Sequence, residues 1–176
     1  IDGQGGTNNS AIFIQNDENS TKTVSGDGIY IHNFNYSLSE AHLFIIEQNL
    51  GGTTNVNLNA VTLSDIHSNV GQINGFMLTV GLFNSVFGSF GTLNATLNNI
   101  TINDFTSVGM TAPFVSIAFA NGGDASINTN VNNSTITGVR GVTGDISPLV
   151  GVKTAAFYSA TAGIGSGNVA TATVDV

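Results

Sequence analysis

Three segments of the chain repeat one pattern of polar and apolar residues. They read NVNLNAVTLSDI at residues 55–66, NATLNNITINDF at 94–105 and NTNVNNSTITGV at 128–139, with offsets of 39 and then 34 residues. A fainter copy, TVSGDGIYIHNF, occupies 23–34, and a shorter one, NVATATVDV, occupies 168–176. Repeats of this length are typical of chains in which each unit stacks on the next and buries a shared core.

Each copy contains two short runs in which apolar and polar residues alternate. In 94–105 the first run carries Ala95 and Leu97, and the second carries Ile100 and Ile102. Alternation with a period of two predicts strands. Asn, Asp and Gly tolerate a left-handed backbone or hydrogen-bond within turns, so polar residues at aligned positions predict corners. The first corner comprises Asp27, Asn59, Asn98 and Asn132, and the second comprises Asn33, Asp65, Asp104 and Gly138.

A third apolar run and a glycine turn complete each unit. The runs occupy 42–46, 75–83, 113–119 and 148–157, and the turns contain Gly51, Gly52, Gly91, Gly122, Gly123 and Gly165. Three strands in a constant order predict a right-handed parallel β-helix of about four to five irregular coils. The chain is then one domain, 1–176, with repeats near 23–54, 55–93, 94–127, 128–167 and 168–176. A β-sandwich with similar short strands is the alternative.

Stacked coils would place the corner asparagines above one another. Each side-chain amide then hydrogen-bonds to the next and satisfies polar groups at the corner. On this basis we expect Asn98→Ala to destabilise the chain by about 1 kcal/mol more than Asn94→Ala, because only Asn98 lies at a predicted corner.

The charge of the chain excludes several classes of partner. It has 11 acidic and three basic residues, a net charge of -8, and no cysteine. So few cations argue against nucleic-acid binding and against binding to anionic membranes. Without cysteine the chain has neither disulfides nor thiolate metal sites. The longest apolar run, 75–90, is interrupted by Gly, Asn and Ser and is too short to span a bilayer, so we expect no membrane insertion.

The segments TLNNITINDF, NVNNSTITGV and GDGIYIHNF resemble the repeats of bacterial surface β-helix proteins, such as autotransporter passengers and large adhesins. The similarity covers most of residues 23–176. It implies an extracellular or cell-surface location and a non-enzymatic structural or adhesive role, for example as a filament subunit or a biofilm component. In one respect the chain departs from a related pattern: its coils are longer than those of pectate-lyase-like proteins, so each must carry a loop or a long strand.

Asp65 and Asp104 are the strongest candidates for chemistry. In stacked coils they would lie about 4.8 Å apart, which resembles the carboxylate pair of a glycosidase, and a cation bridging them is a further hypothesis. The same column holds Asn33 and Gly138, which favours turn geometry as the reason for both acids, and no Asp-rich calcium loop is present. We therefore predict no catalytic residue, no metal ligand and no cofactor.

The remaining polar residues carry weaker signals. His32, His42 and His67 lack a metal-ligand spacing and are predicted to be surface residues. Arg140, the only arginine, has Asp145 nearby and is too isolated to hold an acidic polysaccharide, which argues against a lyase. Trp is absent and Tyr is scarce, so no aromatic platform marks a sugar site. A polysaccharide-acting or carbohydrate-binding β-helix protein remains the alternative function.

The two ends of the sequence predict self-association. The chain begins at Ile1 without a signal peptide, which suggests a mature product or an excised fragment. A β-helix exposes unpaired backbone groups at its ends, and neither end here shows a polar cap or a helix. The strand-like segments there supply the predicted assembly residues Ile12, Ile14, Val169 and Val174. The expected partner is a second copy bound head-to-tail, or the rest of a larger surface protein.

Overall fold

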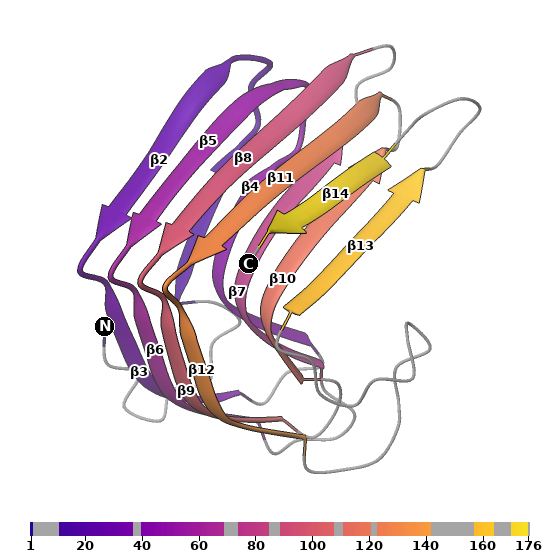
Figure 1. Cartoon of the computed structure of the whole chain (residues 1–176). Helices are drawn as coiled ribbons and strands as arrows, with labels where there is room; N and C mark the ends of the chain where they lie inside the picture. The colour runs from indigo at the N-terminus through magenta and orange to yellow at the C-terminus, as the bar shows by residue number, and fades with distance from the viewer. Residues whose placement is uncertain are drawn as a thin grey trace.

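The chain folds into β-strands that form sheets of parallel strands (Figure 1). The computed structural model describes residues 1, 11–36, 40–68, 74–84, 89–107, 111–120, 123–141, 157–163 and 170–175. Within these ranges the regular structure is entirely strand. The all-β prediction is therefore confirmed.

Successive strands along the chain enter three different sheets in turn. The first sheet contains, in spatial order, β1 (Ile12–Asn16), β4 (Glu40–Gln48), β7 (Asn74–Asn84), β10 (Thr111–Ala120) and β13 (Phe157–Gly163). The second contains β14 (Ala170–Asp175), β11 (Asp124–Asn132), β8 (Phe90–Asn98), β5 (Gly52–Asn59) and β2 (Thr21–Asp27). The third contains β12 (Thr135–Gly141), β9 (Thr101–Ser107), β6 (Thr62–Ser68) and β3 (Tyr30–Tyr36).

Every pairing between the described strands is parallel. β-sandwiches are built from antiparallel sheets, in which neighbouring strands are joined by hairpins or Greek-key connections. The alternative of a β-sandwich is therefore wrong for the described part of the chain. Strands that pair in parallel are far apart in the sequence, because a parallel pair needs a long connection between its strands.

The repeats of the sequence are neighbours in space. Asn59 of β5 lies opposite Asp27 of β2 on one side and Asn98 of β8 on the other, and Asn98 lies opposite Asn132 of β11. The alignment of the repeats is thus the register of the second sheet. The third apolar runs correspond to β4, β7 and β10, but the strand in the last repeat begins at Phe157, and residues 148–156 of the predicted run lie outside the described residues.

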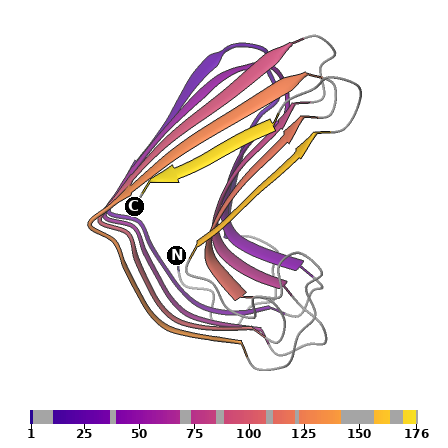
Figure 2. The same ribbon diagram turned by 45° about the vertical axis from the view of Figure 1, so that its right-hand side comes forward.

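Alternation in the three central strands of the second sheet, β5, β8 and β11, supplies much of the core. In β5, Val56 and Leu58 point inward and are buried, whereas Asn55 and Asn57 point outward. The same alternation continues in β8 and β11. Figure 2 shows the three sheets around a common interior, which these inward side chains fill together with residues of β4, β6 and β9. Among the described residues, no helix is long and apolar enough to cross a membrane.

Candidate metal-binding site

The strands of the third sheet share a left-handed bend. Asn33, Asp65, Asp104 and Gly138 have φ angles of 62°, 56°, 51° and 66°. We had expected the second corner to follow the strand. Instead, the bend lies inside β3, β6, β9 and β12. The left-handed residue adds one outward position to the alternation of inward and outward side chains. For this reason the buried Leu63 and Ile66 on either side of Asp65 are three residues apart.

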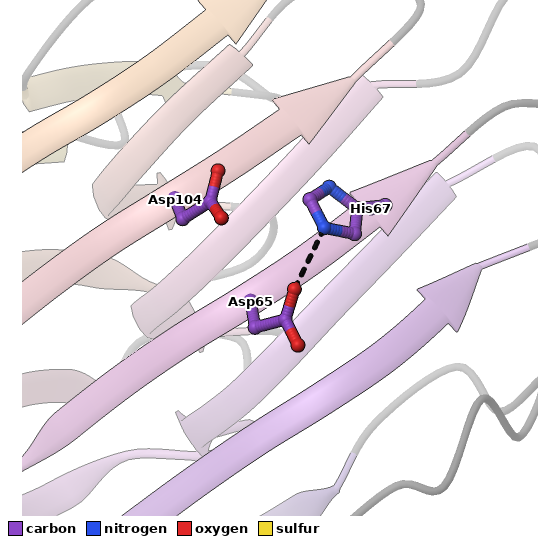
Figure 3. Close-up of side chains that lie close together, drawn as sticks. All are labelled: Asp65, His67 and Asp104. Atoms are coloured by element: carbon purple, nitrogen blue, oxygen red, sulfur yellow. Dashed lines mark hydrogen bonds and ion pairs between the residues drawn. The ribbon is translucent and has the colours of Figure 1, made fainter.

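Asp65 and Asp104 occupy equivalent bends on adjacent strands, and His67 follows Asp65 on the same strand (Figure 3). One ligand atom from each of the three side chains lies within 4.8 Å of the others. His67 Nε2 is 2.8 Å from Asp65 Oδ1, and the two side chains are 37% and 54% exposed. Asp104 is also exposed. The cluster therefore presents two carboxylates and an imidazole to solvent.

The cluster is better suited to binding a cation than to hydrolysing a sugar. One oxygen atom from each carboxylate lies within 4.8 Å of the other, which is compatible with the roughly 5–5.5 Å between the carboxyl groups of a retaining glycosidase. However, both acids are exposed on the outer side of a sheet, whereas ligand sites are usually concave clefts that bury most of the bound molecule. Imidazole and carboxylate groups, in contrast, are the usual nitrogen and oxygen ligands of divalent transition metals.

His67 is the member of the cluster that analysis of the sequence missed. Spacing rules for histidine ligands apply to residues close together in one chain segment, and Asp104 is far from His67 in sequence. The sequence contains a partial signal, because His67 follows Asp65 by two residues, a spacing that places both side chains on the same face of a regular strand but does not show that they meet.

The first corner is displaced by one residue from the prediction. Asp27, Asn59, Asn98 and Asn132 end their strands, and the residues with positive φ are the next ones, Gly28, Ala60, Asn99 and Asn133. The left-handed backbone directs an N–H along the stack: Gly28 N donates to the carbonyl of Asn59, and Ala60 N to that of Asn98, both at 3.1 Å. The sheet ladder thereby continues around the corner.

Side-chain amides at the first corner form hydrogen bonds along the stack. Asn59 Nδ2 donates to Asp27 Oδ1 at 2.7 Å, and Asn132 Nδ2 donates to Asn98 Oδ1 at 3.0 Å. Between these pairs the donor to Asn59 Oδ1 is Asn99 Nδ2, at 2.8 Å, instead of Asn98. The left-handed residue of the third coil thus supplies the link that we had expected from its neighbour.

A second amide ladder runs across the middle of the second sheet. Asn94 Nδ2 donates to Asn55 Oδ1, and Asn128 Nδ2 donates to Asn94 Oδ1, both at 3.2 Å. The premise that Asn98 but not Asn94 takes part in a stack is therefore wrong. Since Asn94 has two such hydrogen bonds, the reason to expect a smaller effect from Asn94→Ala disappears. Asparagine at three aligned positions was the signal for this ladder.

Other predicted residues have structural surroundings or lie outside the described residues. The His32 ring stacks on the Tyr30 ring with centroids 4.4 Å apart. His42 belongs to β4 and Arg140 to β12, where Arg140 lies opposite Thr106, while Asp145 lies outside the described residues. The structure thus gives His32 a stacking contact, and gives His42 and Arg140 a strand position only.

The predicted assembly residues differ in their surroundings. Ile12 and Ile14 of β1 are half-buried and pack against the core, so their side chains face inward and not toward a second molecule. Val174 belongs to β14, and Val169 lies outside the described residues. The side chains of Ile12 and Ile14 therefore do not supply the assembly surface that the sequence predicts for them.

An open cleft of about 460 Å³ lies at the side of the stack formed by β1 and β2. It is lined by both apolar and charged residues, including Ile14, Val24 and Ile46, whose side chains contact the core. Lys22 Nζ pairs with Glu18 Oε2 at 2.7 Å, and this hydrogen bond lowers the pKa of Glu18. Burial, followed by the nearby Asp17, raises the pKa of Glu47. The cleft therefore combines apolar walls with an acidic rim.

Comparison of the chain with protein-family models, with curated proteins and with solved structures gives no match.

Proposed function

We propose that the chain is a right-handed parallel β-helix that serves as a non-enzymatic structural or adhesive module at the cell surface and extends by head-to-tail stacking. The proposed β-helix is supported by two features: successive strands join the three sheets in a constant order, and neighbouring strands pair in parallel. Right-handedness is supported by the general rule that crossovers between parallel strands are right-handed in about 98% of cases.

An extracellular structural role is supported by the outer face of the second sheet. Four aligned rows of Thr, Ser, Asn and Asp cover β2, β5, β8 and β11. The rows contain Thr21, Thr53, Thr92 and Ser126; Thr23, Asn55, Asn94 and Asn128; Ser25, Asn57, Thr96 and Asn130; and Asp27, Asn59, Asn98 and Asn132. The side chains of this surface are short and nearly all uncharged, and amide ladders connect some of them. Few of them could act as catalytic acids, bases or nucleophiles.

The observation that carries the proposal is the matching of the open sheet edges. Among the described strands, β1, β2 and β3 each lack a strand on one side of the stack, and β13, β14 and β12 lack one on the other. Because all pairings are parallel, the β2 edge of one copy can continue the β14 edge of another with the same strand direction. Residue Ile1 already pairs with the outer edge of β3. Its amino group donates to Tyr30 O at 2.6 Å, and His32 N donates to Ile1 O at 3.0 Å.

Stacking of this kind is heterologous, because different edges meet. A heterologous contact that does not close into a ring produces a linear filament. β2 carries two charged side chains: Lys22 pairs with Glu18, and Asp27 accepts a hydrogen bond from Asn59. The proposed filament therefore grows by backbone hydrogen bonds along an edge on which both charged side chains already have partners within the chain.

Proline scanning of β14 tests this proposal. Neighbouring residues of a strand direct their N–H groups to opposite sides, so one of Thr171→Pro and Ala172→Pro removes a donor that faces outward and the other removes one that faces β11. We expect the chain to form linear oligomers as its concentration rises, and the outward variant to remain monomeric while still folded. Sedimentation velocity, electron microscopy and circular dichroism provide the measurements.

Thr171→Ala is the matched control, because it retains the N–H group. A wild-type chain that remains monomeric at high concentration, with the backbone amides of β2 and β14 protected from exchange, would show that the edges are covered and would contradict the proposal.

Binding to a neutral polysaccharide is the second candidate function. It is supported by the aligned rows of hydroxyl and amide side chains on the second sheet. These groups can exchange hydrogen bonds with the uncharged hydroxyl groups of a sugar. We expect the chain to bind an insoluble neutral polysaccharide, and Asn57→Lys combined with Thr96→Lys to weaken that binding about tenfold, or roughly 1.4 kcal/mol. Asn103→Lys, on the third sheet, should leave binding unchanged. Equal loss in both variants, measured by co-sedimentation, would rule out this face.

A further inference from the structure

We propose that Asp65, His67 and Asp104 bind a divalent transition-metal ion of the zinc class, which joins two neighbouring coils. The site lies on the outer face of the third sheet, where β6 and β9 pair in parallel. It is independent of the sheet edges used in the proposed filament.

The donor set selects the class of metal. Two carboxylates and one imidazole supply oxygen and nitrogen ligands and two negative charges, which a divalent cation neutralises. Calcium takes six to eight oxygen ligands, and magnesium keeps an octahedral shell of oxygen, so an imidazole is a poor ligand for either. Zinc accepts nitrogen and oxygen together, and three protein ligands leave a fourth position for water.

The positions of the three groups require little adjustment. In a tetrahedral zinc site with bonds of about 2.1 Å, ligand atoms lie roughly 3.4 Å apart. The ligand atoms here lie within 4.8 Å of one another, and those of His67 and Asp65 are 2.8 Å apart. The two aspartates are exposed and His67 is partly exposed, so their side chains have room to rotate toward a shared ion.

Turn geometry does not explain why two acids stand side by side in this column. The same left-handed bend is formed by Asn33 on one side and by Gly138 on the other, without any charge. The column therefore accepts neutral residues, yet it has carboxylates at two adjacent positions, where they repel each other. The imidazole of His67 reaches the same two positions, whereas the residues opposite it on the neighbouring strands are Asn35 and Thr106.

Metal titration of the purified chain, stripped with a chelator, tests the site. We expect calorimetry to show one equivalent of Zn²⁺ bound per chain, with a rise in melting temperature on addition of metal. Ca²⁺ at the same concentration should neither compete nor raise the melting temperature. The titration is made below the concentration at which the chain associates, so that its result is separate from that of the filament experiment.

Three variants and two controls locate the ion. Asp65→Asn, His67→Gln and Asp104→Asn should each weaken Zn²⁺ binding at least tenfold. The controls are Asp27→Asn, an acid hydrogen-bonded at the first corner, and His32→Gln, which stacks on Tyr30. Absence of stoichiometric Zn²⁺ binding, equal losses in the controls, or full binding by His67→Gln would each overturn the proposal.

Discussion

Phe105→Ala is expected to lower the free energy of unfolding by about 3–5 kcal/mol, the usual result of deleting a buried aromatic side chain. Phe105 is 1% exposed and follows the left-handed bend of β9, opposite Ile66 of β6. Because the bend fixes the direction of the strand on both sides, the neighbouring coils cannot move inward far enough to fill the space. Urea denaturation should show a lower midpoint with an unchanged slope.

Phe90→Ala is the matched control for this prediction. Phe90 is the first residue of β8 and is 60% exposed, so its removal leaves no cavity and should change stability by no more than about 0.5 kcal/mol. A loss of 3–5 kcal/mol is a large fraction of the roughly 5–15 kcal/mol that stabilises a typical domain. Similar midpoints for the two variants would mean that the three sheets do not share a packed interior.

The parallel register of the second sheet was predictable from the sequence because one physical pattern recurs there. Val56 and Leu58 of β5, and Ala95 and Leu97 of β8, alternate with polar residues at equal spacing. A slip of one residue would turn these side chains outward, so the hydrophobic pattern and the register determine each other. The alignment of the repeats therefore gave the neighbours of each residue as well as the strands.

The left-handed residue of the first corner was not predictable from the same reasoning. At this corner the second coil has Ala60 with a φ of 51°, a conformation that alanine rarely adopts. Its N–H bonds to the carbonyl of Asn98 on the next coil, and this neighbour compensates for the local strain. A tertiary contact decides the conformation here, and no local signal marks it.

The cluster of Asp65, His67 and Asp104 was predictable in part. The aligned acids were found, because the repeat places them on adjacent strands. The imidazole was not included, because its position depends on how a left-handed bend turns two outward residues toward each other. Side-chain direction at an irregular strand residue does not follow from alternation alone.

Gly52→Ala is expected to lower the free energy of unfolding by about 3 kcal/mol or more, through backbone strain together with steric overlap. Gly52 has a φ of 98°, and a Cβ atom there would lie 2.7 Å from both the N and the O atoms of Ser20. The overlap is with backbone, which a rotamer change cannot relieve. Gln48 also holds the preceding turn in place, since its Nε2 donates to the carbonyls of Leu50 and Gly51 at 3.1 Å.

Gly28→Ala separates the two contributions. Gly28 has a φ of 63° but no atom within 4 Å of an added Cβ, so this variant carries the strain of a left-handed residue without the overlap. Its expected effect is about 1 kcal/mol, and Ala60 already occupies the equivalent corner of the next coil with a φ of 51°. Thermal and urea unfolding of both variants measure the difference. If Gly28→Ala were as destabilising as Gly52→Ala, the close approach of Gly52 to the Ser20 backbone would not be what requires glycine at the start of β5.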